Sequence, residues 1–257
     1  MITNASLDQH AIYLPASESP LSQDEEWCEL DWEGERRRIR FHDYASIYAI
    51  PGLYEQVFYD LLECASPETV CGLLAEQMAH EDTDPAELVV LELGAGNGMV
   101  GECLTELGVR SIVGVDIVQE AADAAKRDRP DVYDDYVVAD ISNMEPQQEA
   151  ELAAWPFNCL VSVAALGFGD IPPCAFAAAY NLVAPASLVA FNLNEEFLGE
   201  GDGSGFAGLV DRMVDEDWLA VSATQRYRHR FSLDRQPIHY VTMVGSKCQD
   251  VPLDCVE

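Results

Sequence analysis

Residues 86–257 alternate between largely apolar runs and mixed polar segments. The apolar runs cover residues 89–91, 111–117, 136–141, 157–166 and 187–194. Runs that lack polar alternation are typical of strands buried on both faces of a parallel sheet. The segments between and after them predict helices at residues 100–109, 118–127, 174–183 and 209–219. The pattern therefore indicates an α/β fold, in which helices cover both faces of a central sheet.

The end of the chain follows a second pattern. Residues 223–231 alternate strictly, with Arg226, Arg228 and Arg230 on one face of the predicted strand. A second apolar strand at residues 238–244 would return beside it. The sequence thus predicts a C-terminal antiparallel hairpin, whose arginine face would pair with surface carboxylates or bind an acidic ligand.

The N-terminal third divides by composition. Residues 1–34 are polar and acidic and predict a loosely packed arm, whereas residues 35–85 predict a helical cap. Residues 41–59 contain four tyrosines and two phenylalanines, and the Pro51-Gly52 pair divides this stretch into two short helices. These aromatic residues would either pack the cap onto the main domain or form a lid over a ligand.

A glycine-rich loop follows the first apolar run. Gly94, Gly96 and Gly98 stand at every second position, which allows a tight turn and a close approach to a ligand. A pyrophosphate-binding fingerprint would need its third glycine at position 99, where the chain has Met99. Glu92 precedes the loop, and its carboxylate would repel phosphate but accept hydrogen bonds from an ammonium group. The loop therefore predicts a ligand with an amine and without a pyrophosphate.

Two further carboxylates close the next two predicted strands. Asp116 lies 22 residues after Gly94, where an acidic residue binds both ribose hydroxyls of an adenosine. Asp140 ends the third strand in the same way. Because the carboxyl ends of parallel strands meet at one edge of a sheet, both aspartates should lie near the glycine loop.

Together, Glu92, the glycine loop, Asp116 and Asp140 resemble the cofactor motifs of class I S-adenosylmethionine (SAM) dependent methyltransferases. The segments Gly98-Met99-Val100-Gly101 and Val132-Tyr133-Asp134 are similar to the Williams–Beuren-region-like branch of that family. The resemblance implies a doubly wound, Rossmann-like, seven-stranded, mostly parallel sheet with a C-terminal antiparallel hairpin and an N-terminal helical cap. It also implies that Asp140 accepts a hydrogen bond from the adenine amino group.

The same resemblance implies an enzyme that transfers the methyl group of SAM to a small-molecule acceptor by direct displacement, with S-adenosylhomocysteine as product. The residues expected to contact the cofactor are Glu92, Gly94, Ala95, Gly96, Asn97, Gly98, Asp116, Ile117, Asp140, Ile141, Val163 and Tyr44. The acceptor pocket is expected to include Tyr48, Tyr54 and Phe168. Asp170, His229 and His239 are candidate general bases, which only a hydroxyl or protonated amine acceptor needs.

Two other functions share some of these features. A SAM-binding protein without turnover would carry the same cofactor motifs, and the chain has no motif for acceptor chemistry that excludes it. An NAD(P)-dependent oxidoreductase would share the fold, but Met99 and Glu92 count against it. Residues 167–173 depart from the Asn/Asp-Pro-Pro-aromatic sequence of DNA and glutamine N-methyltransferases, which weighs against those substrates.

The net charge and the composition of the chain exclude several classes of partner. The chain has 46 Asp and Glu against 14 Lys and Arg, a net charge of -32, which argues against binding a nucleic acid backbone. The eight cysteines form no CxxC pair and no zinc-ligand spacing with histidine, so no metal site is expected. No apolar run approaches the length of a membrane span, and no signal sequence is recognisable, so we expect a cytoplasmic protein without membrane contact. The sequence leaves the oligomeric state open.

The acidic excess leads to the hypothesis that the protein is adapted to high salt, where ions screen the repulsion between carboxylates. The protein should unfold at low ionic strength and become more stable as potassium chloride is added. Thermal unfolding followed by circular dichroism over a salt series measures this. Full stability in dilute buffer would contradict the hypothesis.

Overall fold

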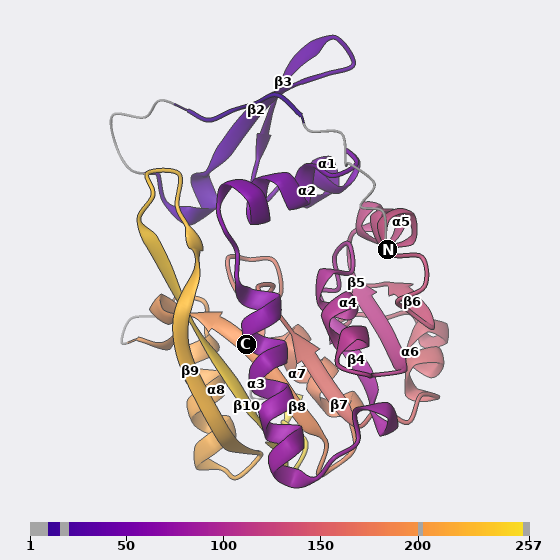
Figure 1. The fold of residues 1–257 in the computed structure, drawn as a ribbon. Helices are drawn as coiled ribbons and strands as arrows, with labels where there is room; N and C mark the ends of the chain where they lie inside the picture. The colour runs from indigo at the N-terminus through magenta and orange to yellow at the C-terminus, as the bar shows by residue number, and fades with distance from the viewer. Residues whose placement is uncertain (1–9, 16–20, 200–202, 254–257) are drawn as a thin grey trace.

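The computed structural model describes residues 10–15, 21–199 and 203–253. Its main element is a seven-stranded sheet with the strand order β6-β5-β4-β7-β8-β10-β9 (Figure 1). In chain order the strands are β4 (Val89–Leu93), β5 (Ser111–Asp116), β6 (Asp135–Val138), β7 (Cys159–Ser162), β8 (Leu188–Asn194), β9 (Leu219–Phe231) and β10 (Pro237–Lys247). The first five are parallel, and β10 runs antiparallel to both β8 and β9. The predicted Rossmann-like sheet with its C-terminal hairpin is confirmed.

Helices cover both faces of this sheet. They are α3 (Ser66–Glu81), α4 (Met99–Glu106), α5 (Gln119–Asp128), α6 (Pro146–Ala153), α7 (Pro173–Leu182) and α8 (Phe206–Asp215). Helices α3 and α4 share one buried core with Val90 of β4, whereas α7 and α8 share another with Leu91. Because successive strand residues point to opposite faces, these are the two layers of a doubly wound sheet.

One helix differs from its predicted bounds. The helix expected at residues 209–219 begins at Phe206 and ends at Asp215. Gly205, with φ of +82°, starts it in the left-handed conformation, and Leu219 is already the first residue of β9. The pattern did not predict α6, because its eight residues bury only one side chain, Leu152.

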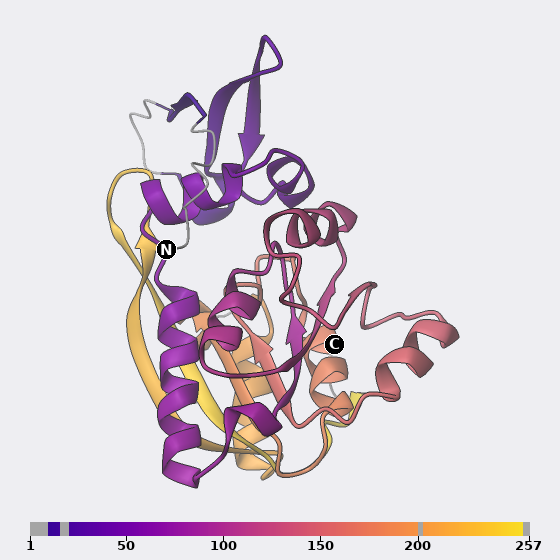
Figure 2. The ribbon, with the colours of Figure 1, turned by 45° about the vertical axis from the view of Figure 1, so that its right-hand side comes forward.

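The N-terminal part forms a separate layer above the carboxyl ends of the parallel strands (Figures 1 and 2). Its strands are β1 (Ile12–Tyr13), β2 (Trp27–Trp32) and β3 (Glu35–Arg40), followed by helices α1 (Tyr44–Tyr48) and α2 (Leu53–Glu55) and the π-helical turn η2 (Gln56–Leu61). The Pro51-Gly52 break is confirmed, because Gly52 adopts φ of +75° between α1 and α2. The β2–β3 hairpin crosses residue 34, where the sequence placed the boundary between arm and cap. Residues 1–9 and 16–20 of the predicted arm lie outside the described residues.

A β-bulge changes the predicted pattern of the C-terminal hairpin. Arg230 pairs with Ile238 and Arg228 pairs with His239, so His229 is an extra residue in β9. The extra residue turns both His229 and Arg230 inward, and they are 5% and 2% exposed. The prediction that Arg230 shares one face of the strand with Arg226 and Arg228 is therefore wrong, because strict alternation ends at the bulge.

Candidate active site

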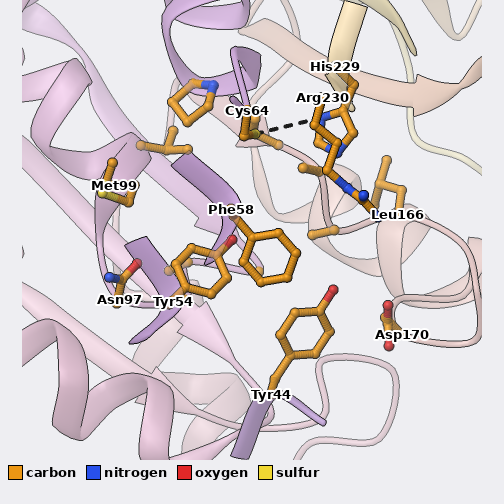
Figure 3. Close-up of a pocket in the computed structure, with 18 of the residues that line it drawn as sticks. Tyr44, Tyr54, Phe58, Cys64, Asn97, Met99, Leu166, Asp170, His229 and Arg230 are labelled. Carbon is orange, nitrogen blue, oxygen red and sulfur yellow. Dashed lines mark hydrogen bonds between the residues drawn. The ribbon is translucent and has the colours of Figure 1, made fainter. Parts of the chain in front are cut away.

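Two neighbouring cavities lie between the cap and the carboxyl ends of the strands. The larger has a volume of about 560 Å³ and the smaller of about 60 Å³. Figure 3 shows the smaller cavity, with Tyr44, Tyr54 and Phe58 of the cap on one side and Asp170 and Arg230 beyond them. The residues that line both cavities are His42, Tyr44, Tyr48, Tyr54, Gly94, Val163, Ala164, Ala165 and Asp170. These shared residues mark the junction between the two cavities.

The glycine loop forms part of that junction. Gly94 and Gly96 adopt φ of +74° and +55°, a region that side chains disfavour. A Cβ atom on Gly94 would lie 2.5 Å from the Cβ of Ala165, and one on Gly96 would lie 2.5 Å from the hydroxyl of Tyr48. Glycine is therefore required at both positions by conformation and by the close approach of neighbouring side chains.

Asp116 ties this loop to the end of β5. Its Oδ2 accepts a hydrogen bond from the Gly96 N–H at 2.9 Å, and its Oδ1 accepts one from the Val118 N–H at 2.9 Å. Burial raises the pKa of Asp116 above its usual value, although these backbone donors oppose the effect. The Asp116 side chain lines the larger cavity. Its bond to Gly96 also shows that this strand end lies beside the glycine loop, as the sequence predicts.

The end of β6 supplies a second polar group to the larger cavity. Asp140 lines it together with Ile117 and Ile141. One carboxylate oxygen of Asp140 accepts hydrogen bonds from the backbone N–H and the hydroxyl of Ser142, at 3.0 and 2.6 Å. Ile117 is 62% exposed although it borders a cavity, so it offers an apolar surface on which a flat ring could pack.

Glu92 is separated from these residues. Its side chain is 1% exposed and lines neither cavity. Its Oε2 accepts a hydrogen bond from the Tyr133 hydroxyl at 3.0 Å, and burial raises its pKa to about 8. The structure thus places Glu92 beneath the glycine loop and does not bring it together with Asp116 and Asp140 around one space.

The other predicted contacts divide between the cavities. Ala95 and Asn97 line the smaller cavity, whereas Val163 lines both. Gly98 lines neither, because its position is covered by Arg129 and Tyr133, which would lie 3.1 and 3.2 Å from an added Cβ atom.

Aromatic side chains of the cap cover the junction. The rings of Tyr44, Tyr48, Tyr54 and Phe58 follow one another, with centroid separations of 6.1, 4.9 and 4.8 Å. Burial raises the pKa of Tyr44 and Tyr48 well above the usual tyrosine value, so their hydroxyls are neutral donors. The tyrosines therefore pack the cap against the main domain, as one of the two expectations had it, and Tyr44, Tyr48 and Tyr54 also line both cavities.

An ion-pair cluster that sequence reasoning missed joins the cap to the glycine loop. Nη1 of Arg129 lies 2.8 Å from Oε1 of Glu55, and its Nε lies 2.8 Å from Oε2 of Glu102. The same Glu55 oxygen accepts a hydrogen bond from the Asn97 amide at 3.1 Å. Arg129 is only 8% exposed, so water screens this cluster less than a surface pair. Its members lie far apart in sequence, and no local pattern predicts them.

The candidate bases occupy three different environments. Asp170 lines both cavities, and its Oδ2 lies 2.9 Å from Nδ1 of His42, a residue that the sequence did not single out. His229 lines only the smaller cavity and lies 2.6 Å from the hydroxyl of Ser66; burial lowers its pKa well below the usual value, so it is neutral. His239 lines neither cavity and lies 3.9 Å from Glu195. Phe168 lines the smaller cavity.

Two negative results concern only the described parts of the chain. Among these residues, no three His, Cys, Asp or Glu side chains come together in a way that would hold a metal ion. No helix within them is both long and apolar enough to cross a lipid bilayer.

A family model described as a methyltransferase domain matches residues 91–191. This segment runs from β4 through the glycine loop and the strand-end aspartates into β8. No curated protein matches the sequence.

Solved structures with the same fold cover most of the chain. N-methyltransferase NodS from Bradyrhizobium japonicum, in complex with S-adenosyl-L-homocysteine, has 13% identity and a TM-score of 0.55, covering 80% of this chain and 97% of its own. A SAM-dependent methyltransferase from Clostridium acetobutylicum has 12% identity and a TM-score of 0.51, covering 77% and 96%. At these identities the likeness establishes the architecture.

The buried Glu92 predicts a specific pH dependence of stability. Its pKa rises from about 4.5 to about 8 on folding, so the folded state binds the proton more tightly. The stability it provides is complete below about pH 4.5 and falls by about 1.4 kcal/mol per pH unit up to about pH 8. Glu92→Gln, which keeps an acceptor for Tyr133, should remove this contribution, so the variant gains stability over the wild type as pH rises.

Urea unfolding at fixed high salt, from about pH 5 to about pH 8, measures the difference between variant and wild type. Glu76→Gln, on the exposed side of α3, is the matched control and should follow the wild type at every pH. A Glu92→Gln variant that also follows the wild type would show that Glu92 is ionised in the folded protein.

Proposed function

We propose that this protein, whose residues 91–191 form a SAM-dependent methyltransferase domain, transfers the methyl group of SAM to a small-molecule acceptor beneath the tyrosine-rich cap. The observation that carries the proposal is the position of the two cavities. They meet at the carboxyl ends of β4 and β7, where the sheet order reverses, which is where open α/β sheets bind ligands. The larger cavity also has the size of a ligand site.

The chemistry of the larger cavity fits the adenosyl part of SAM. Each Asp116 carboxylate oxygen accepts one hydrogen bond from a backbone N–H and retains a lone pair that can accept a second from a ribose hydroxyl. Asp140 has an oxygen available for the adenine amino group, and the exposed Ile117 offers a surface for the base. Glu92 would support the loop through Tyr133 instead of contacting the methionine amine directly. When bound, SAM supplies an activated methyl group.

The acceptor end is the smaller cavity. A volume of about 60 Å³ holds only a few water molecules, so a larger acceptor requires outward movement of the cap. The contacts between the cap and the main domain include the packing of α1 on α5, the Glu55–Arg129 ion pair and the His42–Asp170 pair. A net charge of -32 disfavours nucleic acids as acceptors and leaves small molecules as the preferred class.

Membership of the Williams–Beuren-region-like branch is a finer hypothesis. It rests on residues 98–101 and 132–134, which lie in contact: a Cβ atom on Gly101 would be 2.5 Å from Cγ1 of Val132 and 2.9 Å from the Tyr133 hydroxyl. The two segments thus form one packed unit, which contacts Glu92 through the Tyr133 hydroxyl. This unit concerns the cofactor end and implies no particular acceptor.

The function is tested by turnover with SAM against a panel of small phenols, amines, carboxylic acids and thiols. Formation of S-adenosylhomocysteine that depends on the acceptor, together with a methylated product in mass spectrometry, supports the proposal. Absence of product from every acceptor, with SAM bound, would contradict it.

The strand-end aspartates generate a binding prediction. Asp116→Asn should weaken S-adenosylhomocysteine binding by roughly tenfold or more, because a charged acceptor of hydroxyl hydrogen bonds becomes neutral and one of its oxygens becomes a donor. Isothermal titration calorimetry measures the affinity, and circular dichroism checks that the variant is folded. Asp123→Asn on the exposed face of α5 is the matched control and should bind like the wild type. Equal affinity of all three proteins would rule out a cofactor role for Asp116.

A further inference from the structure

His42 and Asp170 form a pair at the junction of the two cavities. His42 stands just before α1 in the cap, and Asp170 lies in the loop between β7 and α7 of the main domain. Nδ1 of His42 and Oδ2 of Asp170 are 2.9 Å apart, and the side chains are 14% and 28% exposed. The pair is thus partly shielded from solvent. It joins the cap to the main domain through two residues that are 128 positions apart in sequence.

The hydrogen bond determines which nitrogen can accept a proton. A carboxylate accepts but does not donate, so Nδ1 of His42 carries the hydrogen and Nε2 of the neutral ring keeps a free lone pair. No residue in the described parts of the chain forms a hydrogen bond with Nε2. A carboxylate-oriented imidazole of this kind is one arrangement by which proteins present a general base.

Neighbouring rings hold the imidazole in place. Its centroid lies 5.7 Å from that of Tyr44 and 5.4 Å from that of Phe168, both in edge contacts. The other ionisable groups that line these cavities are Asp43, Tyr48, Tyr54, Tyr59, Cys64, Asp116, Asp140, His229, Arg230 and Tyr240. Arg230 lies 2.7 Å from Glu26, so its charge is already paired.

The loop that carries Asp170 has an unusual backbone. Ala164 and Phe168 adopt φ of +54° and +52°, and Gly167 adopts φ of +94°. A Cβ atom on Gly167 would lie 2.3 Å from the ring of Phe197, so only glycine fits there. The Asp170 N–H closes a turn by donating to the Gly167 carbonyl at 2.9 Å. Positive φ at residues other than glycine costs free energy, so the packing around this loop must hold Ala164 and Phe168 in these conformations.

We propose that His42 accepts the proton of a hydroxyl acceptor during methyl transfer and that Asp170 positions the His42 ring for this step. The inference rests on the proposed function. The acceptor oxygen forms a bond with the methyl carbon, the carbon–sulfur bond breaks with both electrons remaining on sulfur, and the hydroxyl proton moves to Nε2 of His42. The imidazolium is stabilised by Asp170 and releases its proton to water through the larger cavity, which His42 also lines.

The walls of the smaller cavity favour a phenol among hydroxyl compounds. Aromatic side chains form much of its lining, including Tyr44, Tyr48, Tyr54, Phe58, Phe168 and Tyr240. Flat rings pack against such walls, and a phenolic hydroxyl is a poor nucleophile until a base removes its proton. A carboxylate or thiolate acceptor would need no base and would leave His42 without a role.

The first test compares His42→Gln and Asp170→Asn with the wild type on a panel of simple phenols. His42→Gln should lower kcat by roughly 100-fold while KM and S-adenosylhomocysteine affinity change little, because general base catalysis contributes roughly 100-fold or more. The acid limb of the wild-type rate profile should disappear. His80→Gln, on the exposed C-terminal turn of α3, is the matched histidine control and should keep both the rate and the profile.

A second test does not depend on turnover. Nitrogen-15 chemical shifts of the His42 ring in the wild type should report the tautomer protonated at Nδ1, and Asp170→Asn should lose this preference. The opposite tautomer in the wild type overturns the inference, and so does a His42→Gln variant with unchanged kcat on phenols. Turnover of carboxylic acids or thiols but of no phenol also overturns it while leaving the methyltransferase function intact; failure of the wild type to bind S-adenosylhomocysteine would instead overturn the function itself.

Discussion

The hydrogen bond from the Gly96 N–H to the Asp116 carboxylate is the interaction on which the site depends. It connects the loop after β4 with the end of the neighbouring parallel strand, beside the hydrogen bonds that the Gly94 and Ala95 N–H groups donate to the Val115 carbonyl at 2.8 and 3.1 Å. Gly96 donates this bond while it adopts φ of +55°, a conformation that residues with a side chain disfavour. A carboxylate held in this way is oriented before any ligand arrives, which reduces the ordering that binding requires.

The loop is also held from two other directions. From below, the Tyr133 hydroxyl donates to Glu92 and packs against Gly98 and Gly101. From above, Arg129 connects Glu55 of the cap with Glu102 of α4. These contacts hold the glycine loop in one conformation, although its three glycines would allow many others in an unfolded chain. The N-terminal layer has further contacts with the main domain, among them the buried Glu26–Arg230 ion pair at 2.7 Å and the His42–Asp170 pair at 2.9 Å.

The sheet could be predicted because its signals are local. Each buried strand is an apolar run, and Asp116 and Asp140 mark strand ends by position alone. The role of Glu92 was less predictable: its spacing suggests a ligand contact, but only the packing of Tyr133 over it reveals that it faces away from both cavities. His42 could not be found from sequence, because its importance arises from a partner 128 residues away.

The β-bulge at His229 has a consequence for how such a protein could change its specificity. One inserted residue in β9 brings a paired arginine and a neutral histidine to the wall of the smaller cavity. Deleting His229 would join Arg228 directly to Arg230 and restore strict alternation, so Arg230 would keep its inward position opposite Ile238 while the wall would lose its histidine. The bulge thus lets two consecutive polar side chains face one cavity, which strict alternation allows only at every second position. The number of residues in this strand therefore sets how many polar groups reach the wall, in addition to the identity of its side chains.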